Sequence, residues 1–179
     1  MILGQKTILF DALGTDIPYL AALYRHHQEK LLRAPLSFTA EELQGHIARL
    51  LAGGSWQAYI GMTKEDVPRR LGCFYLTNVT PHACTVNGML DQGVLKGLAK
   101  RIKKSYKMGP SFAEDALTTL LTSLPQVRVD AYIQASNALA LRLCRVTGFQ
   151  QEGVLRQAVR VNGHAEDLIV LSVIRLGGA

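Results

Sequence analysis

The spacing of hydrophobic residues changes along the chain, and each change marks an expected element of secondary structure. Residues 6–13 mix β-branched and apolar types and predict a strand. Over residues 16–33 the apolar positions recur every three to four residues, as on one face of a helix. A second helix is expected over residues 39–51, because Glu42 follows Thr39 by three residues in the pattern of a capping box.

The middle of the chain carries runs rich in aromatic and β-branched residues, with turn-forming residues between them. Such runs are typical of strands. We expect three strands, at residues 56–63, 70–77 and 83–90. Two helical stretches follow, at residues 94–106 and 111–124, because Gly109-Pro110 interrupts the helical spacing and Ser111 can cap the second stretch.

The last third predicts one strand, one helix and a hairpin. Their expected ranges are residues 127–133, 137–147, 153–161 and 165–175. Gly148 ends the helix, and Asn162-Gly163 is the strongest turn signal in the chain. The order of elements is therefore β-α-α-β-β-β-α-α-β-α-β-β, an α/β arrangement with an antiparallel first half.

Composition places the chain among globular proteins. Hydrophobic residues make up 48% and charged residues 19% of the sequence, which excludes the low-hydrophobicity regime of disordered chains. A length of 179 residues suits one domain spanning residues 1–179. No run approaches the roughly 20 apolar residues of a membrane helix, and the N-terminus lacks a secretory pattern. We expect a cytoplasmic protein that does not contact a membrane.

Cysteine and histidine spacing gives no support for a metal site. Cys73, Cys84 and Cys144 are far apart and form no C-x-x-C pair, and the five histidines show no ligand spacing. We expect reduced thiols, no metal, and histidines that are ordinary surface or core residues. A P-loop starting at Gly88 would need lysine where Val94 stands, and no G-x-S-x-G elbow is present. Both chemistries are therefore not expected.

The formal net charge of +6 is unevenly distributed. Basic residues gather in one short segment, namely Lys96, Lys100, Arg101, Lys103, Lys104 and Lys107. A solvated face of a surface helix explains such a stripe. The same charge would also attract the phosphates of a cofactor, or a polyanion such as RNA or DNA. Tyr106 is the only aromatic residue there, so base stacking is poorly supported.

A longer pattern begins at Ala135. It reads A-S-N-A-L-A-L-R-L-C-R-V-T-G-F-Q-Q-E-G-V-L-R, and N-G-H-A-E-D follows a little further on. The pattern resembles the C-terminal part of the GNAT superfamily of N-acetyltransferases, nearest to the branch that acetylates ribosomal-protein N-termini. The positions that match in identity and spacing are Asn137, Gly148, Phe149, Glu152, Gly153, Leu155, Arg156, Gly163 and Asp167. Of these, Glu152, Arg156 and Asp167 are expected to pair across strands rather than take part in catalysis.

The resemblance implies a GNAT-like mixed central sheet with flanking helices, in which two strands splay apart to form a cleft for acetyl-coenzyme A. Asn137, at the end of a strand, would hold the pantetheine arm, although an asparagine there can also simply cap the next helix. A loop that opens the main helix would hold the pyrophosphate on its backbone N–H groups. The residues that best match this loop are Lys107, Met108, Gly109, Ser111 and Phe112, and residues 94–99 form a competing match. Pro110 lacks an N–H, so one phosphate contact would be absent.

The resemblance also implies how the transfer would run. Backbone donors near Asn87, Gly88 and Met89 would polarise the thioester carbonyl. Many relatives place a tyrosine that acts as general acid seven residues after the asparagine, and Cys144 stands at that position here. A thiol can donate a proton, but cysteine is also a common buried residue.

Three carboxylates compete for the role of general base. Glu114 is the candidate, with Asp115 and Asp91 as alternatives. We expect an acetyl-coenzyme A-dependent N-acetyltransferase that acts on a primary amine, either a protein N-terminus or a small amine. The alternative is a non-catalytic GNAT-like binding protein that contacts nucleic acid or an acidic partner through the segment Lys96–Lys107. A homodimer is compatible with either hypothesis.

Overall fold

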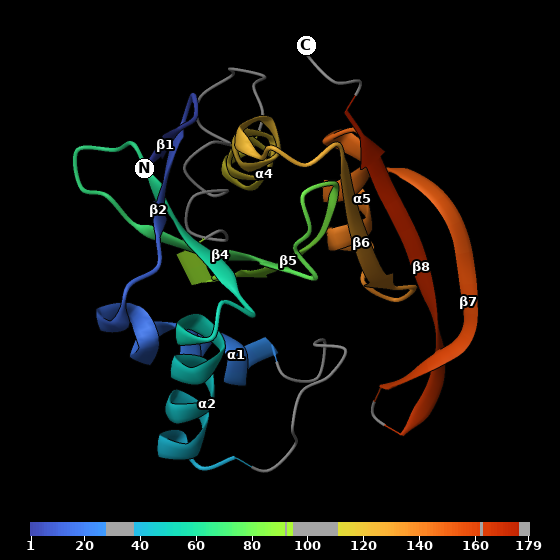
Figure 1. Cartoon of the computed structure of the whole chain (residues 1–179), viewed down its shortest axis with the longest axis horizontal. Coiled ribbons are helices and arrows are strands. Elements are labelled where there is room, and N and C mark those ends of the chain that lie inside the picture. The colour runs from blue at the N-terminus through green and yellow to red at the C-terminus, as the bar shows by residue number, and fades with distance from the viewer. Residues whose placement is uncertain (28–37, 92, 95–110, 162, 176–179) are drawn as a thin grey trace.

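A mixed sheet forms the centre of the computed structural model, which describes residues 1–27, 38–91, 93–94, 111–161 and 163–175 (Figure 1). The eight described strands lie in the order β1-β2-β3-β4-β5-β6-β8-β7. Their bounds are β1 Ile2–Leu3, β2 Thr7–Asp11, β3 Gln57–Thr63, β4 Arg70–Thr77, β5 Ala83–Leu90, β6 Arg128–Gln134, β7 Gln150–Val161 and β8 His164–Ile174. Neighbouring strands are antiparallel except β5 and β6, which are parallel. The predicted α/β class and antiparallel first half are confirmed.

Helices cover both faces of the sheet. The described helices are η1 Gly14–Asp16, α1 Ile17–His27, α2 Ala40–Ala52, α4 Phe112–Ser123 and α5 Ala138–Val146. Figure 1 shows α1 and α2 on one side of the sheet and α4 on the other. Phe74 of β4 belongs to the core under α4 and α5, whereas its neighbours Cys73 and Tyr75 belong to the core under α1 and α2. This alternation is the two-residue period of a strand, so each face of β4 has its own core.

Short sequence patterns predicted the bounds of most described helices and strands to within a few residues. Strands β4 and β5 have the predicted bounds. Helices α2 and α4 begin at the predicted caps, because the Thr39 hydroxyl accepts the Glu42 N–H and the Ser111 hydroxyl accepts the Glu114 N–H, both at 3.2 Å. The two-residue strand β1 was not predicted, since it is too short to show a period. The helix predicted over residues 94–106 lies almost entirely outside the described residues.

The C-terminal hairpin also follows its prediction. Val161 pairs with His164, and Gly163 has a φ of +81°, so the turn lies where Asn-Gly was expected. Strand β7 begins at Gln150, three residues before the predicted start at Gly153. Strand β8 lies between β6 and β7, an order that the sequence analysis did not address.

The charged residues of the hairpin have structural partners. The Glu152 carboxylate accepts a hydrogen bond from Ser172 and lies 3.5 Å from Arg128. The Asp167 carboxylate accepts the Gln157 N–H at 2.8 Å, where the chain has a positive φ. The Ser172 bond joins the paired strands β7 and β8, and the Asp167 bond stabilises the irregular part of β7, so Glu152 and Asp167 make the contacts across strands that were expected. Arg156, of which the same was expected, makes no ion pair among the described residues.

Asp115 holds α4 against the first strands. Its carboxylate accepts the N–H groups of Gln5 and Lys6 at 3.0 and 2.9 Å and the Thr7 hydroxyl at 2.6 Å. Burial raises the pKa of Asp115, but these hydrogen bonds outweigh burial and lower it below its usual value. Gly4 completes the contact, because a Cβ there would lie 2.5 Å from the Asp115 carboxylate. The start of α4 is thus fixed relative to the sheet.

Candidate active site

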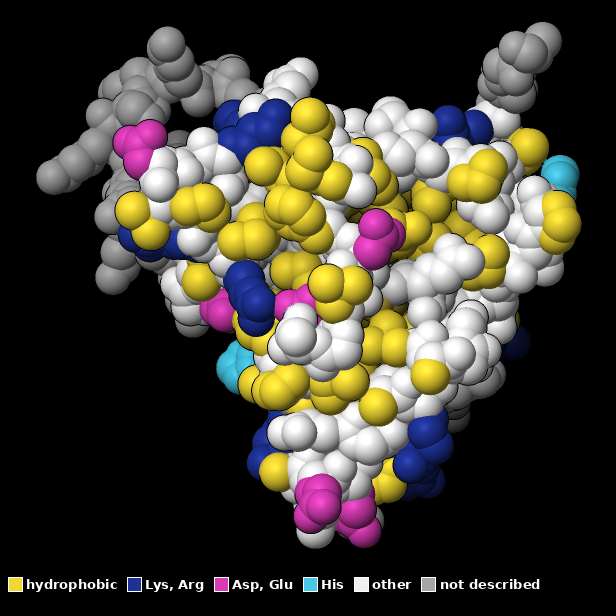
Figure 2. All heavy atoms as spheres, turned by 60° about the vertical axis from the view of Figure 1, so that its left-hand side comes forward, with side chains coloured by type: hydrophobic (Ala, Val, Ile, Leu, Met, Phe, Trp, Pro, Cys, Tyr) yellow, Lys and Arg dark blue, Asp and Glu magenta, His cyan; other side chains and the backbone are white. Residues whose placement is uncertain are grey.

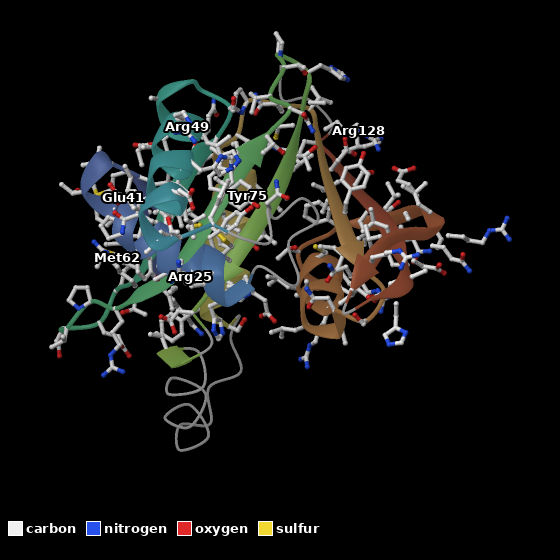
Figure 3. All side chains as sticks on the ribbon, turned by 90° about the horizontal axis from the view of Figure 1, so that it is seen from below. Arg25, Glu41, Arg49, Met62, Tyr75 and Arg128 are labelled. Atoms are coloured by element: carbon white, nitrogen blue, oxygen red, sulfur yellow. The ribbon has the colours of Figure 1, made fainter. Side chains whose placement is uncertain are left out.

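Strands β5 and β6 separate after a short parallel contact. They pair at only three positions, the last of which joins Thr85 to Asp130. Beyond that pair, residues 86–90 of β5 and 131–134 of β6 do not pair with each other as strands. Figure 3 shows the green β5 and the brown β6 diverging, with α1 and α2 beside one strand and α5 beside the other. The splayed pair that the sequence analysis expected is present.

A cavity of about 770 Å³ fills the opening between the two strands. Val86, Ala131 and Cys144 form part of its wall and belong to the core under α4 and α5. Leu23 and Tyr75 also line it, and they belong to the core under α1 and α2. The cavity therefore crosses the plane of the sheet, and two ligands entering from opposite faces could meet inside it.

The backbone of β5 presents hydrogen-bonding groups to this cavity. The Asp91 N–H donates to the Leu71 carbonyl at 2.8 Å and so points toward β4. Because residues of an antiparallel pair alternate in this respect, the backbone groups of Gly88 and Leu90 point away from β4, toward the cavity. The Leu90 carbonyl agrees with this, since it accepts a hydrogen bond from His27 Nε2 at 2.8 Å. The Gly88 N–H is consequently a donor at the cavity wall.

The other two residues of the predicted donor group lie differently. By the same alternation, the backbone groups of Asn87 and Met89 face β4. The Asn87 side chain lines the cavity and donates to the Thr77 hydroxyl at 3.2 Å. Met89 is fully buried in the core under α1 and α2 and does not line the cavity.

Asn137 caps a helix and stands at the cavity, so both roles that its sequence position allowed stay open. It caps α5, since its side-chain oxygen accepts the Ala140 N–H at 3.3 Å. It also lines the cavity. Its amide Nδ2 has no hydrogen-bond partner among the described residues. The cap orients the side chain and leaves the amide N–H₂ group available to a ligand carbonyl.

Cys144 lies about two turns further along α5 than Asn137 and also lines the cavity. It is a free cysteine with 5% of its surface exposed. Burial raises the pKa of the Cys144 thiol to about 11. At neutral pH the side chain is therefore a protonated thiol, able to donate a weak S–H hydrogen bond but not to act as a thiolate.

The predicted pyrophosphate loop is only partly described. Lys107, Met108 and Gly109 lie outside the described residues, whereas Ser111 and Phe112 stand at the start of α4. The Ser111 N–H donates to the Glu114 carboxylate at 2.7 Å. Glu114 therefore completes the cap of α4, and it is not among the residues that line the cavity.

The structure separates the three carboxylates that competed for the role of base. Glu114 is held in the cap, and Asp115 is engaged with the first strands. Asp91, which follows β5, lines the cavity. Among the described lining residues it is the only acidic one.

Helix α1 contributes cavity residues that sequence reasoning missed. Tyr19, His26 and His27 all line the cavity, although the histidines were expected to be ordinary residues. His27 is buried and bonded to β5, and its ring meets that of His26 edge-on with centroids 5.0 Å apart. No local signal could have found them, because helical spacing shows which face is buried but not what that face meets.

Surface charge and metal chemistry add little in the described part of the chain. Figure 2 shows acidic and basic side chains scattered among apolar ones, and the coloured residues on that face form no continuous basic patch. The segment Lys96–Lys107 lies outside the described residues, so its proposed role stays a prediction. The described residues contain no group of three or more His, Cys, Asp or Glu side chains placed to hold a metal ion. Within the same residues, no helix is long and apolar enough to cross a membrane.

Comparisons with known proteins connect this geometry to a fold family. No protein-family model matches the sequence, and no curated protein matches it. Solved structures do match. A spermidine N-acetyltransferase from Vibrio cholerae, in complex with CoA and spermine, is 14% identical, with a TM-score of 0.75 over 95% of this chain and 96% of that one.

Two further structures are similar over nearly the whole chain. One is an acetyltransferase from Salmonella typhimurium that modifies the N-terminal serine of 50S ribosomal subunit protein L7/L12; it is 19% identical, with a TM-score of 0.69 and 95% of each chain covered. The other is a probable GNAT-family acetyltransferase from Chromobacterium violaceum, 21% identical, with a TM-score of 0.71 over 97% of this chain and 85% of that one. The chain has the GNAT fold, and its structural neighbours are N-acetyltransferases.

Proposed function

We propose that this protein transfers the acetyl group of acetyl-coenzyme A to a primary amine, either a protein N-terminus or a small amine. The observation that carries the proposal is the cavity between β5 and β6, which crosses the sheet where the two strands stop pairing. A pantetheine arm is narrow and rich in amides, so it suits a slot between two strand edges whose backbone groups are unpaired. The neighbours with this fold include one solved with CoA and an amine together.

Residues at different positions in the cavity take different roles in binding and catalysis. Asn137 offers its Nδ2 group to a pantetheine carbonyl while its oxygen caps α5. The Gly88 N–H stabilises the oxyanion that forms on the thioester carbonyl when the amine attacks. The apolar wall formed by Val86, Leu117 and Ala131 excludes water from the thioester, which limits its hydrolysis.

The proposed reaction is an acyl transfer from the thioester to the amine. The nitrogen lone pair attacks the carbonyl carbon, a C–N bond forms, and the C–S bond breaks in the collapse of the tetrahedral intermediate. An ammonium acceptor loses one proton to solvent before its lone pair can attack, and the second proton that the nitrogen loses after the C–N bond has formed goes to the departing sulfur. Cys144 assists by donating its S–H hydrogen bond to the leaving sulfur, because its raised pKa keeps it protonated.

We place the pyrophosphate of the substrate near the start of α4, where the helix dipole favours negative charge. Ser111 and Phe112 stand there. The Ser111 N–H is already occupied by Glu114, so a phosphate oxygen would have to displace that carboxylate or bind elsewhere in the loop. Displacing the Glu114 carboxylate would cost free energy and so weaken phosphate binding. Substitution of Glu114 would remove that cost.

A pair of substitutions at Asn137 tests the proposal. Serine is a good N-cap, so Asn137→Ser keeps the cap of α5 but loses the amide donor, whereas Asn137→Ala loses both. Loss of one hydrogen bond of about 1 kcal/mol weakens acetyl-coenzyme A binding about fivefold. We expect this loss in both variants by isothermal titration, with a lower unfolding free energy only in Asn137→Ala.

The same preparations should release free thiol from acetyl-coenzyme A when an amine acceptor is added. Mass spectrometry of the acceptor should show the added acetyl group. If the wild-type protein binds no acetyl-coenzyme A at millimolar concentration, the proposed function is wrong.

A further inference from the structure

The half of the cavity under α1 has a distinct chemistry from the half beside α5. It is lined by Tyr19, His26 and Leu23 of α1 and by Asp91 at the end of β5. We propose that this half binds the α-amino group of a peptide, and that polyamines are poor acceptors. The inference rests on the proposed transferase function and names its substrate class.

The charge of the lining residues is the first argument. Asp91 is the only acidic residue among the described residues that line the cavity, and both lining histidines lie on the acceptor side. One carboxylate can neutralise one ammonium group. A polyamine brings further ammonium groups, each of which needs a carboxylate or water when it enters a confined space.

The geometry of Asp91 makes it an anchor for that single charge. Its backbone N–H is bonded to the Leu71 carbonyl at 2.8 Å, and one carboxylate oxygen accepts the Val94 N–H at 3.0 Å. These two bonds fix the residue at the end of β5. The other carboxylate oxygen has no partner among the described residues, and so it can accept a charge-assisted hydrogen bond from an ammonium group.

Tyr19 supplies the second recognition group. Its hydroxyl is buried and has no hydrogen-bond partner among the described residues. Burial, and after it the negative charge of Asp91, raise the pKa of Tyr19, so the phenol stays protonated and can donate. A buried donor without a partner is costly, and a ligand oxygen at this position would remove that cost.

The surroundings of Tyr19 favour a neutral oxygen there over a second cation. The Arg70 guanidinium lies 4.8 Å from the centre of the Tyr19 ring, and Arg70 pairs with Asp16 at 2.9 Å. A peptide N-terminus has one ammonium group with a carbonyl oxygen on the adjacent carbon. That pair of groups matches a carboxylate acceptor beside a phenol donor, whereas a second ammonium group would approach the arginine.

The test compares acceptors at fixed acetyl-coenzyme A, with thiol release and product mass as readouts. The acceptors are a short peptide with a free N-terminus, the same peptide N-terminally acetylated but carrying one lysine, and spermidine. We expect kcat/KM for the free peptide to exceed that for spermidine by at least a hundredfold, and the product mass to place the acetyl group on the α-nitrogen. Equal or better turnover of spermidine, or of the blocked lysine peptide, would overturn the inference.

Variants of the two recognition residues complete the test. Asp91→Asn keeps an oxygen for the Val94 N–H but removes the charge and replaces the other oxygen by an NH2 group, so kcat/KM for the peptide should fall about a hundredfold while acetyl-coenzyme A binding is unchanged. Asp66→Asn is the matched control, because Asp66 is exposed and outside the cavity. Tyr19→Phe should lower kcat/KM for the peptide about tenfold, and that of a simple alkylamine, which has no carbonyl to accept from the phenol, by a smaller factor.

Two failures remain distinguishable in these experiments. Loss of peptide selectivity with intact acetyl-coenzyme A binding contradicts the acceptor assignment alone. Absence of acetyl-coenzyme A binding in the wild-type protein contradicts the transferase function and the acceptor assignment together.

Discussion

Filling the cavity from α5 is the most direct perturbation of the proposed site. Ala140 lines the cavity, and its neighbour two positions earlier, Ala138, is exposed and does not. Substitution of either alanine by phenylalanine lowers helix propensity by about 0.5 kcal/mol, so the two variants cost α5 the same amount. Only Ala140→Phe places an aromatic ring where the pantetheine arm would lie.

The size of the effect follows from the cost of overpacking. A ligand that must displace an added ring, or distort around it, loses about 1–3 kcal/mol. At about 1.4 kcal/mol for each tenfold change, Ala140→Phe should weaken acetyl-coenzyme A binding by roughly fivefold to somewhat over a hundredfold. Ala138→Phe should bind like the wild-type protein.

Isothermal titration with acetyl-coenzyme A measures both dissociation constants, and thermal unfolding confirms that both variants fold. The reasoning fails if Ala140→Phe binds as tightly as wild type, because the ligand would then occupy a different part of the molecule. It fails equally if both variants lose binding to the same extent, since the effect would then belong to α5 as a helix rather than to the cavity.

Three further predictions concern individual side chains. Glu114→Ala removes half of the capping box of α4, so urea denaturation should show a free energy of unfolding lower by about 1 kcal/mol. Acetyl-coenzyme A should bind equally well or more tightly. A hundredfold fall in kcat at unchanged stability would instead make Glu114 the base. Because the pKa of Cys144 is raised to about 11, its alkylation rate, followed by peptide mass spectrometry, should keep rising up to about pH 11; a plateau near pH 8.5 would contradict this. The folded-state pKa of Asp115 is lowered, so its stabilisation is present above its unfolded pKa of about 3.9 and is lost as pH falls through the folded value. Asp115→Asn should therefore lower the unfolding free energy by about 2 kcal/mol at pH 7 and by clearly less at pH 2, and an equal loss at both pH values would refute the assignment.

Much of the local structure could be predicted because its causes are local. The capping boxes at Thr39 and Ser111 act between a hydroxyl and the N–H three residues later, and the hairpin turn needs only Gly163 at positive φ. The run of matches around Asn137 likewise indicated the GNAT fold, and the splayed strands confirm that fold. Each of these features depends on residues close together in the chain.

The contents of the cavity could not be predicted in the same way. Glu114 was the candidate base because it lies near the expected pyrophosphate loop. Its place in the first turn of α4 makes it part of the cap, and only the packing of α4 shows that it stays outside the cavity. Tyr19 and Asp91 are more than seventy residues apart, and nothing local relates them. They meet because α1 packs over β5.

The amino-acid sequence by itself determined roughly where most of the described helices and strands lie, since hydrogen bonds within a few residues and the period of apolar positions decide those elements. The tertiary structure alone decided that β8 lies between β6 and β7, that β5 and β6 part after Thr85, and which side chains line the opening. A strand can pair with any of several strands that are distant in the sequence. Which pairing has the lowest free energy depends on hydrophobic cores that are built from the whole chain. The site exists because that assembly leaves two neighbouring strands only partly paired.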